Sequence, residues 1–112
     1  MYTVIRKYDL TPGTKEKMIQ DVQERLVPIL SRVPGFRDYS LVEVGDNEVA
    51  VTSTFNTFAD AKASARLTRD WLVEHTEFFQ EVSTLVTGEV RVHSMSDRLP
   101  PTNELELLRG VF

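Results

Sequence analysis

Strand-like and helix-like segments follow one another along this chain in the order β-α-β-β-α-β, and this order constrains the fold more than any other feature. β-Branched and aromatic residues are frequent in four segments, which predicts a strand in each. The Thr11-Pro12-Gly13 break follows the first strand, and the Asp46-Asn47 turn joins the second and third into a β-hairpin. The predicted strands are residues 2–8, 37–45, 48–55 and 82–93.

Two amphipathic helices are predicted between these strands. Thr14 can cap the first helix, and Pro34-Gly35 ends it. Pro28 lies inside the first helix, so we expect a kink or a shorter helix, because proline cannot donate a backbone hydrogen bond. The second helix is predicted at about 58–79. Apolar residues recur at helical spacing in both, at Met18, Val22, Leu26, Ile29 and Val33, and at Ala61, Ala65, Leu72 and Phe79.

The predicted sheet is four-stranded and antiparallel, and it carries apolar residues on both faces. Two helices can cover only one face of such a sheet, and a face open to water should be mostly polar. In the second strand, however, Tyr39 and Leu41 point to one side while Val42 and Val44 point to the other. We therefore expect a second copy of the chain to cover the face that the helices leave open, most simply as a symmetric homodimer.

Length and charge limit the classes of function. The chain has 112 residues, enough for one domain, and a formal net charge of −4. A negative chain is unsuited to non-specific binding of nucleic acid or of anionic membranes, so neither partner is expected. No cysteine is present, which excludes disulfides and thiolate chemistry. The N-terminal residues lack the pattern of a signal peptide, and a cytoplasmic protein is predicted.

The C-terminal residues differ from the rest of the chain. We expect a domain at residues 1–94 and a tail at residues 95–112, in which Pro100-Pro101 prevents the last strand from continuing. Asn103 could cap a short helix in this tail. Leucines and a terminal Val111-Phe112 make the tail too apolar for an ordinary polar extension, so it is predicted to pack on its own domain or on the partner subunit.

Several features in register carry a resemblance to a known family. They are Leu10-Thr11-Pro12-Gly13 after the first strand, Val33-Pro34-Gly35-Phe36 after the first helix, the Asp46-Asn47 hairpin, and Thr87-Gly88-Glu89-Val90 in the last strand. Over residues 2–94 the chain resembles the antibiotic-biosynthesis-monooxygenase-like family of dimeric α/β-barrel proteins. The resemblance implies a ferredoxin-like subunit, two helices on one face of the sheet, and a ligand pocket between sheet and helices.

Members of that family include cofactor-independent monooxygenases that act on aromatic polyketides, haem-degrading oxygenases, and proteins without known activity. The resemblance therefore implies either a cofactor-independent monooxygenase of a small aromatic substrate, or a non-catalytic ligand-binding or accessory dimer. Haem-degrading relatives have an asparagine on the first strand, where this chain has Arg6 or Lys7. Their tryptophan and histidine are well separated, whereas Trp71 and His75 are one turn apart, so haem degradation is not expected.

We choose five residues as candidates for catalysis or substrate binding. In an oxygenase of that kind, His75 could act as the base and Arg6 could stabilise a substrate phenolate, which makes both candidate catalytic residues. Trp71 could form an aromatic wall beside His75, since four residues along a helix bring them to one face. Tyr39 and Arg91 are further candidates for substrate binding. The alternative is structural: Trp71 as core, Tyr39 as a strand aromatic, and the two arginines in ion pairs with Glu43 or Glu89.

Metal and cofactor sites are not predicted. The two histidines, His75 and His93, lie on different elements, and no HExxH pattern is present. The glycines form neither GxGxxG nor a Walker pattern, and no GxSxG elbow is found. We therefore expect no metal and no bound cofactor.

Overall fold

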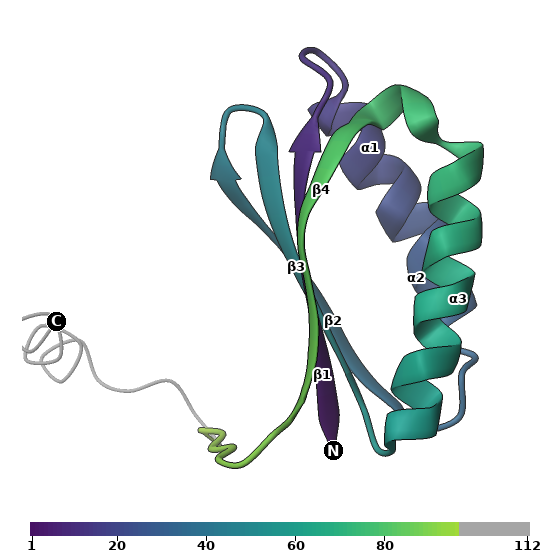
Figure 1. Cartoon of the computed structure of the whole chain (residues 1–112), viewed down its shortest axis with the longest axis vertical. Coiled ribbons are helices and arrows are strands. Elements are labelled where there is room, and N and C mark those ends of the chain that lie inside the picture. The colour runs from purple at the N-terminus through teal and green to yellow at the C-terminus, as the bar shows by residue number, and fades with distance from the viewer. Residues whose placement is uncertain (97–112) are drawn as a thin grey trace, which may run out of the picture.

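The computed structural model describes residues 1–96, with the side chains of 81–84 not described. Most of the predicted tail, including the helix expected after Asn103, lies outside the described residues. Two helical segments, α1–α2 and α3, pack on one side of a twisted sheet (Figure 1). The elements are β1 (Tyr2–Leu10), α1 (Lys15–Asp21), a π-helical turn η1 (Val22–Leu26), α2 (Val27–Leu30), β2 (Phe36–Gly45), β3 (Glu48–Phe55), α3 (Phe58–Glu74), a 3-10 turn η2 (Thr76–Phe78) and β4 (Phe79–Glu89).

The four strands form one antiparallel sheet in the order β2-β3-β1-β4. β1 lies at the centre, so Arg6 is opposite Val51 of β3 on one side and opposite Leu85 of β4 on the other. The predicted ferredoxin-like α+β fold is therefore confirmed, with both helical segments on one face. Within residues 1–96, no helix combines the length and the apolar character needed to cross a bilayer.

The core lies between the sheet and the helices. Strand alternation points one face of β1 and β3 toward the helices, and the burial of each large apolar side chain there contributes roughly 1.5–3 kcal/mol. Phe78 of η2 joins this core although it lies in a turn. The buried apolar residues are Val4, Tyr8, Leu10, Val49, Val51 and Phe55 from the sheet, and Met18, Val22, Leu26, Leu30, Val33, Ala61, Trp71 and Phe78 from the helices and turns.

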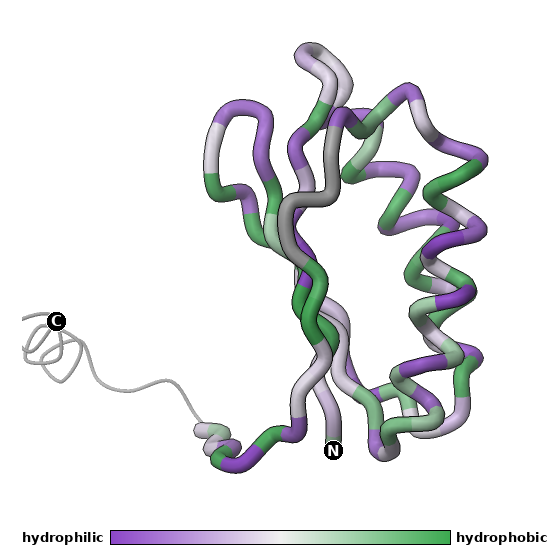
Figure 2. Tube along the Cα trace, in the orientation of Figure 1, coloured by the Kyte–Doolittle hydropathy of each residue, from purple (hydrophilic) through white to green (hydrophobic). Residues whose placement is uncertain are grey.

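The other face of the sheet carries exposed apolar side chains, as the sequence predicted. Ile5, Val42, Val44 and Val86 are each between 42% and 52% exposed. Strand pairing places Ile5 of β1 opposite Val86 of β4, and Val42 of β2 opposite Ala50 of β3, so each of the four strands has an apolar residue on this face. The colouring by hydropathy shows an apolar stretch at the middle of the sheet, on the path of β4 (Figure 2). Within residues 1–96, no helix packs on this face of the sheet.

The first helical segment is divided as Pro28 suggested. Residues 15–30 stay helical throughout, but a π-helical turn occupies Val22–Leu26, and Pro28 lies near the start of the short helix α2. Proline lacks the N–H that would bond to Glu24, and its ring crowds that carbonyl. A π turn at this point relieves both conflicts, since π-bulges insert one extra residue into the helical ladder.

The second helix is shorter than predicted, and the last strand begins earlier. α3 ends at Glu74 rather than near Phe79, because His75 leaves the helical region with φ −129° and ψ 40°. β4 then begins at Phe79 and ends at Glu89, rather than spanning 82–93. The error arose because Phe78 and Phe79 continue the apolar periodicity of the helix, whereas they are buried from the turn and from the strand.

Candidate functional site

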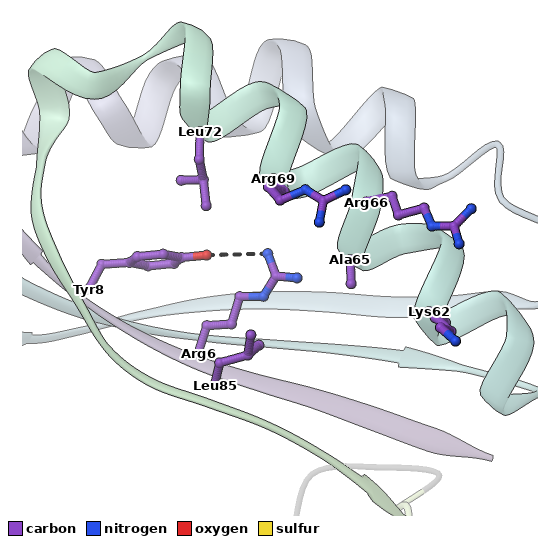
Figure 3. Close-up of a pocket in the computed structure, with 8 residues that line it drawn as sticks. All are labelled: Arg6, Tyr8, Lys62, Ala65, Arg66, Arg69, Leu72 and Leu85. Carbon is purple, nitrogen blue, oxygen red and sulfur yellow. Dashed lines mark hydrogen bonds between the residues drawn. The ribbon is translucent and has the colours of Figure 1, made fainter.

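A cleft of about 850 Å³ lies between α3 and the half of the sheet formed by β1 and β4 (Figure 3). Its volume falls within the range of roughly 300–1,000 Å³ that is usual for small-molecule sites. Leu85 of β4 is on the helix-facing side of the sheet and yet is 58% exposed, so the helices leave this edge open. We call it the Arg6 cleft, and its lining residues are Arg6, Tyr8, Lys62, Ala65, Arg66, Arg69, Leu72 and Leu85.

Arg6 lies at the floor of this cleft with only 7% of its surface exposed. Strand alternation explains its direction, because Val4, Arg6, Tyr8 and Leu10 share the face of β1 that meets the helices. Its Nη1 donates a hydrogen bond to the Tyr8 hydroxyl at 3.3 Å, and its Nε has no partner among the described residues. A buried guanidinium without a counter-charge is costly, which makes Arg6 a candidate for binding an anion.

Tyr8 supplies a second donor beside Arg6. Its hydroxyl oxygen accepts the bond from Arg6, so its own proton is free to point to a ligand. Burial raises the pKa of Tyr8 above the ordinary tyrosine value, and the charge of Arg6 opposes that shift only in part. Tyr8 therefore stays protonated near pH 7. Together, Arg6 and Tyr8 present two donor groups to the floor of the cleft.

The helical wall of the cleft carries three more cations. Lys62, Arg66 and Arg69 are exposed and lie four and three residues apart along α3, which brings them to one side of the helix. Figure 3 shows all three on α3, the wall opposite β1, with the guanidinium groups of Arg66 and Arg69 extending along the helix. The ion pairs among the described side chains involve Lys7 and Lys15, and none involves these three.

The remaining lining is apolar, and none of the described lining residues is acidic. Ala65 and Leu72 of α3 face Leu85 of β4 and the ring of Tyr8. The cleft is therefore electropositive although the chain as a whole is negative. Such a site concentrates anions, and its apolar walls suit the body of an aromatic molecule. Within residues 1–96, no three histidine or carboxylate side chains are grouped to hold a metal ion.

Trp71 and His75 lie side by side, as their spacing predicted, but outside the lining of the Arg6 cleft. Their rings stack with centroids 4.4 Å apart and an interplanar angle of 19°. His75 Nδ1 lies 2.7 Å from the Trp71 backbone oxygen, and the Phe78 ring lies near both, with centroids 5.9 Å from His75 and 6.5 Å from Trp71. Trp71 is buried in the core, and its Nε1 has no partner in the described part of the chain.

Tyr39 and Arg91 are also apart from the cleft. Tyr39 is half-buried on β2 and borders, with Trp71, an interior space of about 10 Å³ that is in effect filled by side chains. Burial raises the pKa of Tyr39 well above its ordinary value, and nearby Tyr8 adds to the shift. Arg91 is exposed beyond the end of β4. Of the five residues chosen from the sequence, only Arg6 lines the cleft, and the roles of all five stay predictions.

The sequence did not reveal the cations of α3 as part of a site. The structural alternative for Arg6, an ion pair with a strand glutamate, is not formed among the described residues, and Glu43 pairs with Lys15 at 3.2 Å instead. The available signal was the spacing of Lys62, Arg66 and Arg69 on one side of the helix. This spacing alone is equally typical of an ordinary helix surface.

Comparison with known proteins agrees with the fold. A family model described as antibiotic biosynthesis monooxygenase matches residues 1–68. HapK from Hahella chejuensis superposes with a TM-score of 0.70 at 13% identity, covering 88% of this chain and 100% of HapK. A protein of unknown function from Nitrosomonas europaea gives 0.69 at 12% identity, covering 87% and 95%.

A dimeric ferredoxin-like protein from an uncultured marine organism gives a TM-score of 0.65 at 9% identity, covering 85% of this chain and 97% of that protein. No curated protein matches the sequence. At these identities the solved structures bear on the fold, and the family is shown by the match over residues 1–68.

Proposed function

Because this chain belongs to the antibiotic biosynthesis monooxygenase family, we propose that it binds a small aromatic anion in the Arg6 cleft and oxidises it with O₂ without a cofactor. The observation that carries the proposal is the guanidinium of Arg6, which is buried beside Tyr8 with no carboxylate partner in the described residues. A buried cation of this kind stabilises an oxyanion more strongly than an exposed cation does, because water screens it less.

The chemistry would proceed through the ionised substrate. Four cations around the cleft favour the charged form of a bound phenol or enol and so lower its pKa. Arg6 and Tyr8 would hold the resulting oxyanion, and the electron-rich ring would transfer an electron to O₂. Insertion of one oxygen atom converts a ring C–H of the phenolate or enolate into C=O, while the other oxygen leaves as water with that hydrogen and the proton that the substrate lost on ionisation. The reaction thus balances with O₂ as the only oxidant.

Oxygen uptake tests this proposal. Wild-type protein, Arg6→Met and the exposed control Arg32→Met would be compared on a panel of naphthols and anthrones. We expect turnover by the wild type and the control, and a decrease of about 10²–10³-fold in Arg6→Met, the usual effect of removing an oxyanion donor.

The same assay includes His75→Ala, because the catalytic role of His75 stays a prediction. Turnover that depends on His75 but not on Arg6 would contradict the assignment of the site to the cleft. Absence of oxygen uptake across the whole panel would contradict the proposed oxygenase activity.

A second candidate function is a non-catalytic ligand-binding dimer. It is favoured by one observation, that the described lining of the cleft contains neither histidine nor carboxylate to take a proton. Such a protein would bind the same aromatic anions without consuming O₂. Calorimetric binding together with a flat oxygen trace would therefore identify it.

We also propose that the exposed sheet face is covered by a second copy of the chain. Ile5, Val42, Val44 and Val86 form an apolar surface that water would otherwise contact. A structural relative is described as dimeric, which supports the same arrangement. Light scattering after size exclusion should give a dimer for wild type and for Val73→Glu on exposed α3, but a monomer for Val42→Glu. A monomeric wild type at micromolar concentration would contradict the proposal.

A further inference from the structure

We infer that the ligand of the Arg6 cleft carries a second anionic group, a carboxylate, which binds the α3 cations while the reacting oxygen lies at Arg6. This inference rests on the proposed function, since it assigns Arg6 to the reacting oxygen. It names a substrate class that the family membership leaves open: an aromatic hydroxy acid in place of a neutral phenol. The cations concerned are Lys62, Arg66 and Arg69.

The two sets of donors lie on opposite walls of the cleft. Arg6 and Tyr8 come from β1 and are buried, whereas Lys62, Arg66 and Arg69 come from α3 and are exposed. At 1.5 Å per residue, the α3 cations extend over about 10 Å along the helix axis. A single oxyanion at the floor can accept from Arg6 and Tyr8, but it leaves this row of cations without a partner.

Apolar surface separates the two sets. Ala65 and Leu72 on the helix and Leu85 on β4 line the space between the floor and the rim. An aromatic body fits such walls, and its two ends then reach different groups. The reacting oxygen would lie at Arg6, and a carboxylate at the far end would lie among Arg66, Arg69 and Lys62. A carboxylate suits arginine because two parallel N–H···O bonds can form.

The charges on α3 are not explained by pairing within the helix. Lys62 and Arg66 are four residues apart, and Arg66 and Arg69 are three apart, and like charges at these spacings destabilise a helix. Asp70 is also four residues from Arg66, but no ion pair forms between them within the described chain. A row of like charges beside a buried, unpaired arginine is therefore consistent with a site for a ligand that has more than one negative group.

Three ligands built on the same hydroxynaphthalene ring test the inference. They are 6-hydroxy-2-naphthoate, its neutral amide, and 2-naphthol, each titrated by calorimetry into wild-type protein. We expect the carboxylate to bind about tenfold more tightly than the amide, because exposed charge pairs each change affinity only severalfold. This advantage should shrink with added salt, since the α3 cations are exposed.

Two double variants with equal changes in net charge supply the control. Arg66→Gln/Arg69→Gln should remove the advantage of the carboxylate, and Arg25→Gln/Arg32→Gln, at exposed positions outside the cleft, should keep it. Arg66→Lys/Arg69→Lys should restore part of it, because lysine keeps the charge but not the two parallel N–H groups of arginine. Circular dichroism of each variant checks folding.

The outcomes separate this inference from the proposed function. Equal affinity of wild-type protein for the carboxylate and the amide would overturn the inference, while binding of 2-naphthol would leave the proposed function standing. An advantage that persists in Arg66→Gln/Arg69→Gln would also overturn it. If none of the three ligands binds, both the inference and the proposed function are wrong.

Discussion

Replacing Arg6 with methionine should stabilise the unliganded protein while it removes the activity. Arg6 is 7% exposed, its nearest polar partner is the Tyr8 hydroxyl at 3.3 Å, and its Nε is unpaired in the described structure. A buried guanidinium with so few partners lowers the free energy of unfolding, so we ascribe the presence of Arg6 to the binding of a ligand rather than to stability. Methionine has a similar length and fills the same space without the charge.

The size of the effect follows from two opposing terms. Exchanging buried charges for apolar residues of similar volume is neutral or stabilising by about 1–4 kcal/mol. Loss of the bond from Arg6 to Tyr8 costs on the order of 1 kcal/mol, because that bond is long. We therefore expect a net gain of about 0–3 kcal/mol, with a midpoint near 1.5 kcal/mol. With an unfolding entropy near 2.1 cal/mol/K per residue, the midpoint corresponds to a rise in Tm of roughly 6 °C.

Urea unfolding followed by the fluorescence of Trp71 would measure the change, with calorimetry for Tm. Protein concentration must be equal in all samples, because the proposed dimer would make the free energy of unfolding depend on concentration. Arg32→Met is the exposed control and should change the free energy of unfolding by less than about 0.5 kcal/mol. A loss of 1 kcal/mol or more in Arg6→Met would show that Arg6 is a structural residue and would refute the reasoning.

Three further predictions concern the fold. Phe78→Ala should cost about 3–5 kcal/mol in urea unfolding, because Phe78 is 1% exposed in the core, and a loss below 1 kcal/mol would contradict that placement. Gly35→Ala should lower stability by roughly 1–3 kcal/mol, since Gly35 has φ +78° and a Cβ would collide with α3, whereas Gly88→Ala should be nearly neutral. The free energy of unfolding should fall as pH rises above about 10, because burial raises the pKa of Tyr8 and Tyr39, so the unfolded chain loses these protons first. Unfolding curves from pH 9 to 11 measure this slope, and an unchanged slope in Tyr8→Phe/Tyr39→Phe would contradict its cause.

The sequence predicted the sheet well because strand alternation has a clear physical signature. The period of two in the first strand puts Arg6 on the same face as Val4, and both are buried in the structure. The period of two in β2 likewise predicted the exposed apolar pair Val42 and Val44. In both strands, side-chain direction is a local property that needs no knowledge of the neighbours.

The cleft could not be predicted in the same way because it depends on how α3 lies over the sheet. From the sequence, an ordinary charged helix surface explains Lys62, Arg66 and Arg69 equally well. Only the structure shows that they line the same cleft as Arg6. The spacing of Trp71 and His75 correctly predicted their contact, but not that the pair lies away from the cleft. Which side of a helix borders a cleft is set by tertiary packing rather than by periodicity.

A structure of the wild-type protein with bound 6-hydroxy-2-naphthoate would test the central claim most directly. The claim predicts that the ligand's hydroxyl oxygen lies about 2.7–3.2 Å from both an Arg6 Nη and the Tyr8 hydroxyl. A ligand seated beside His75, or on the open face around Val42 and Val86, with Arg6 untouched, would contradict it.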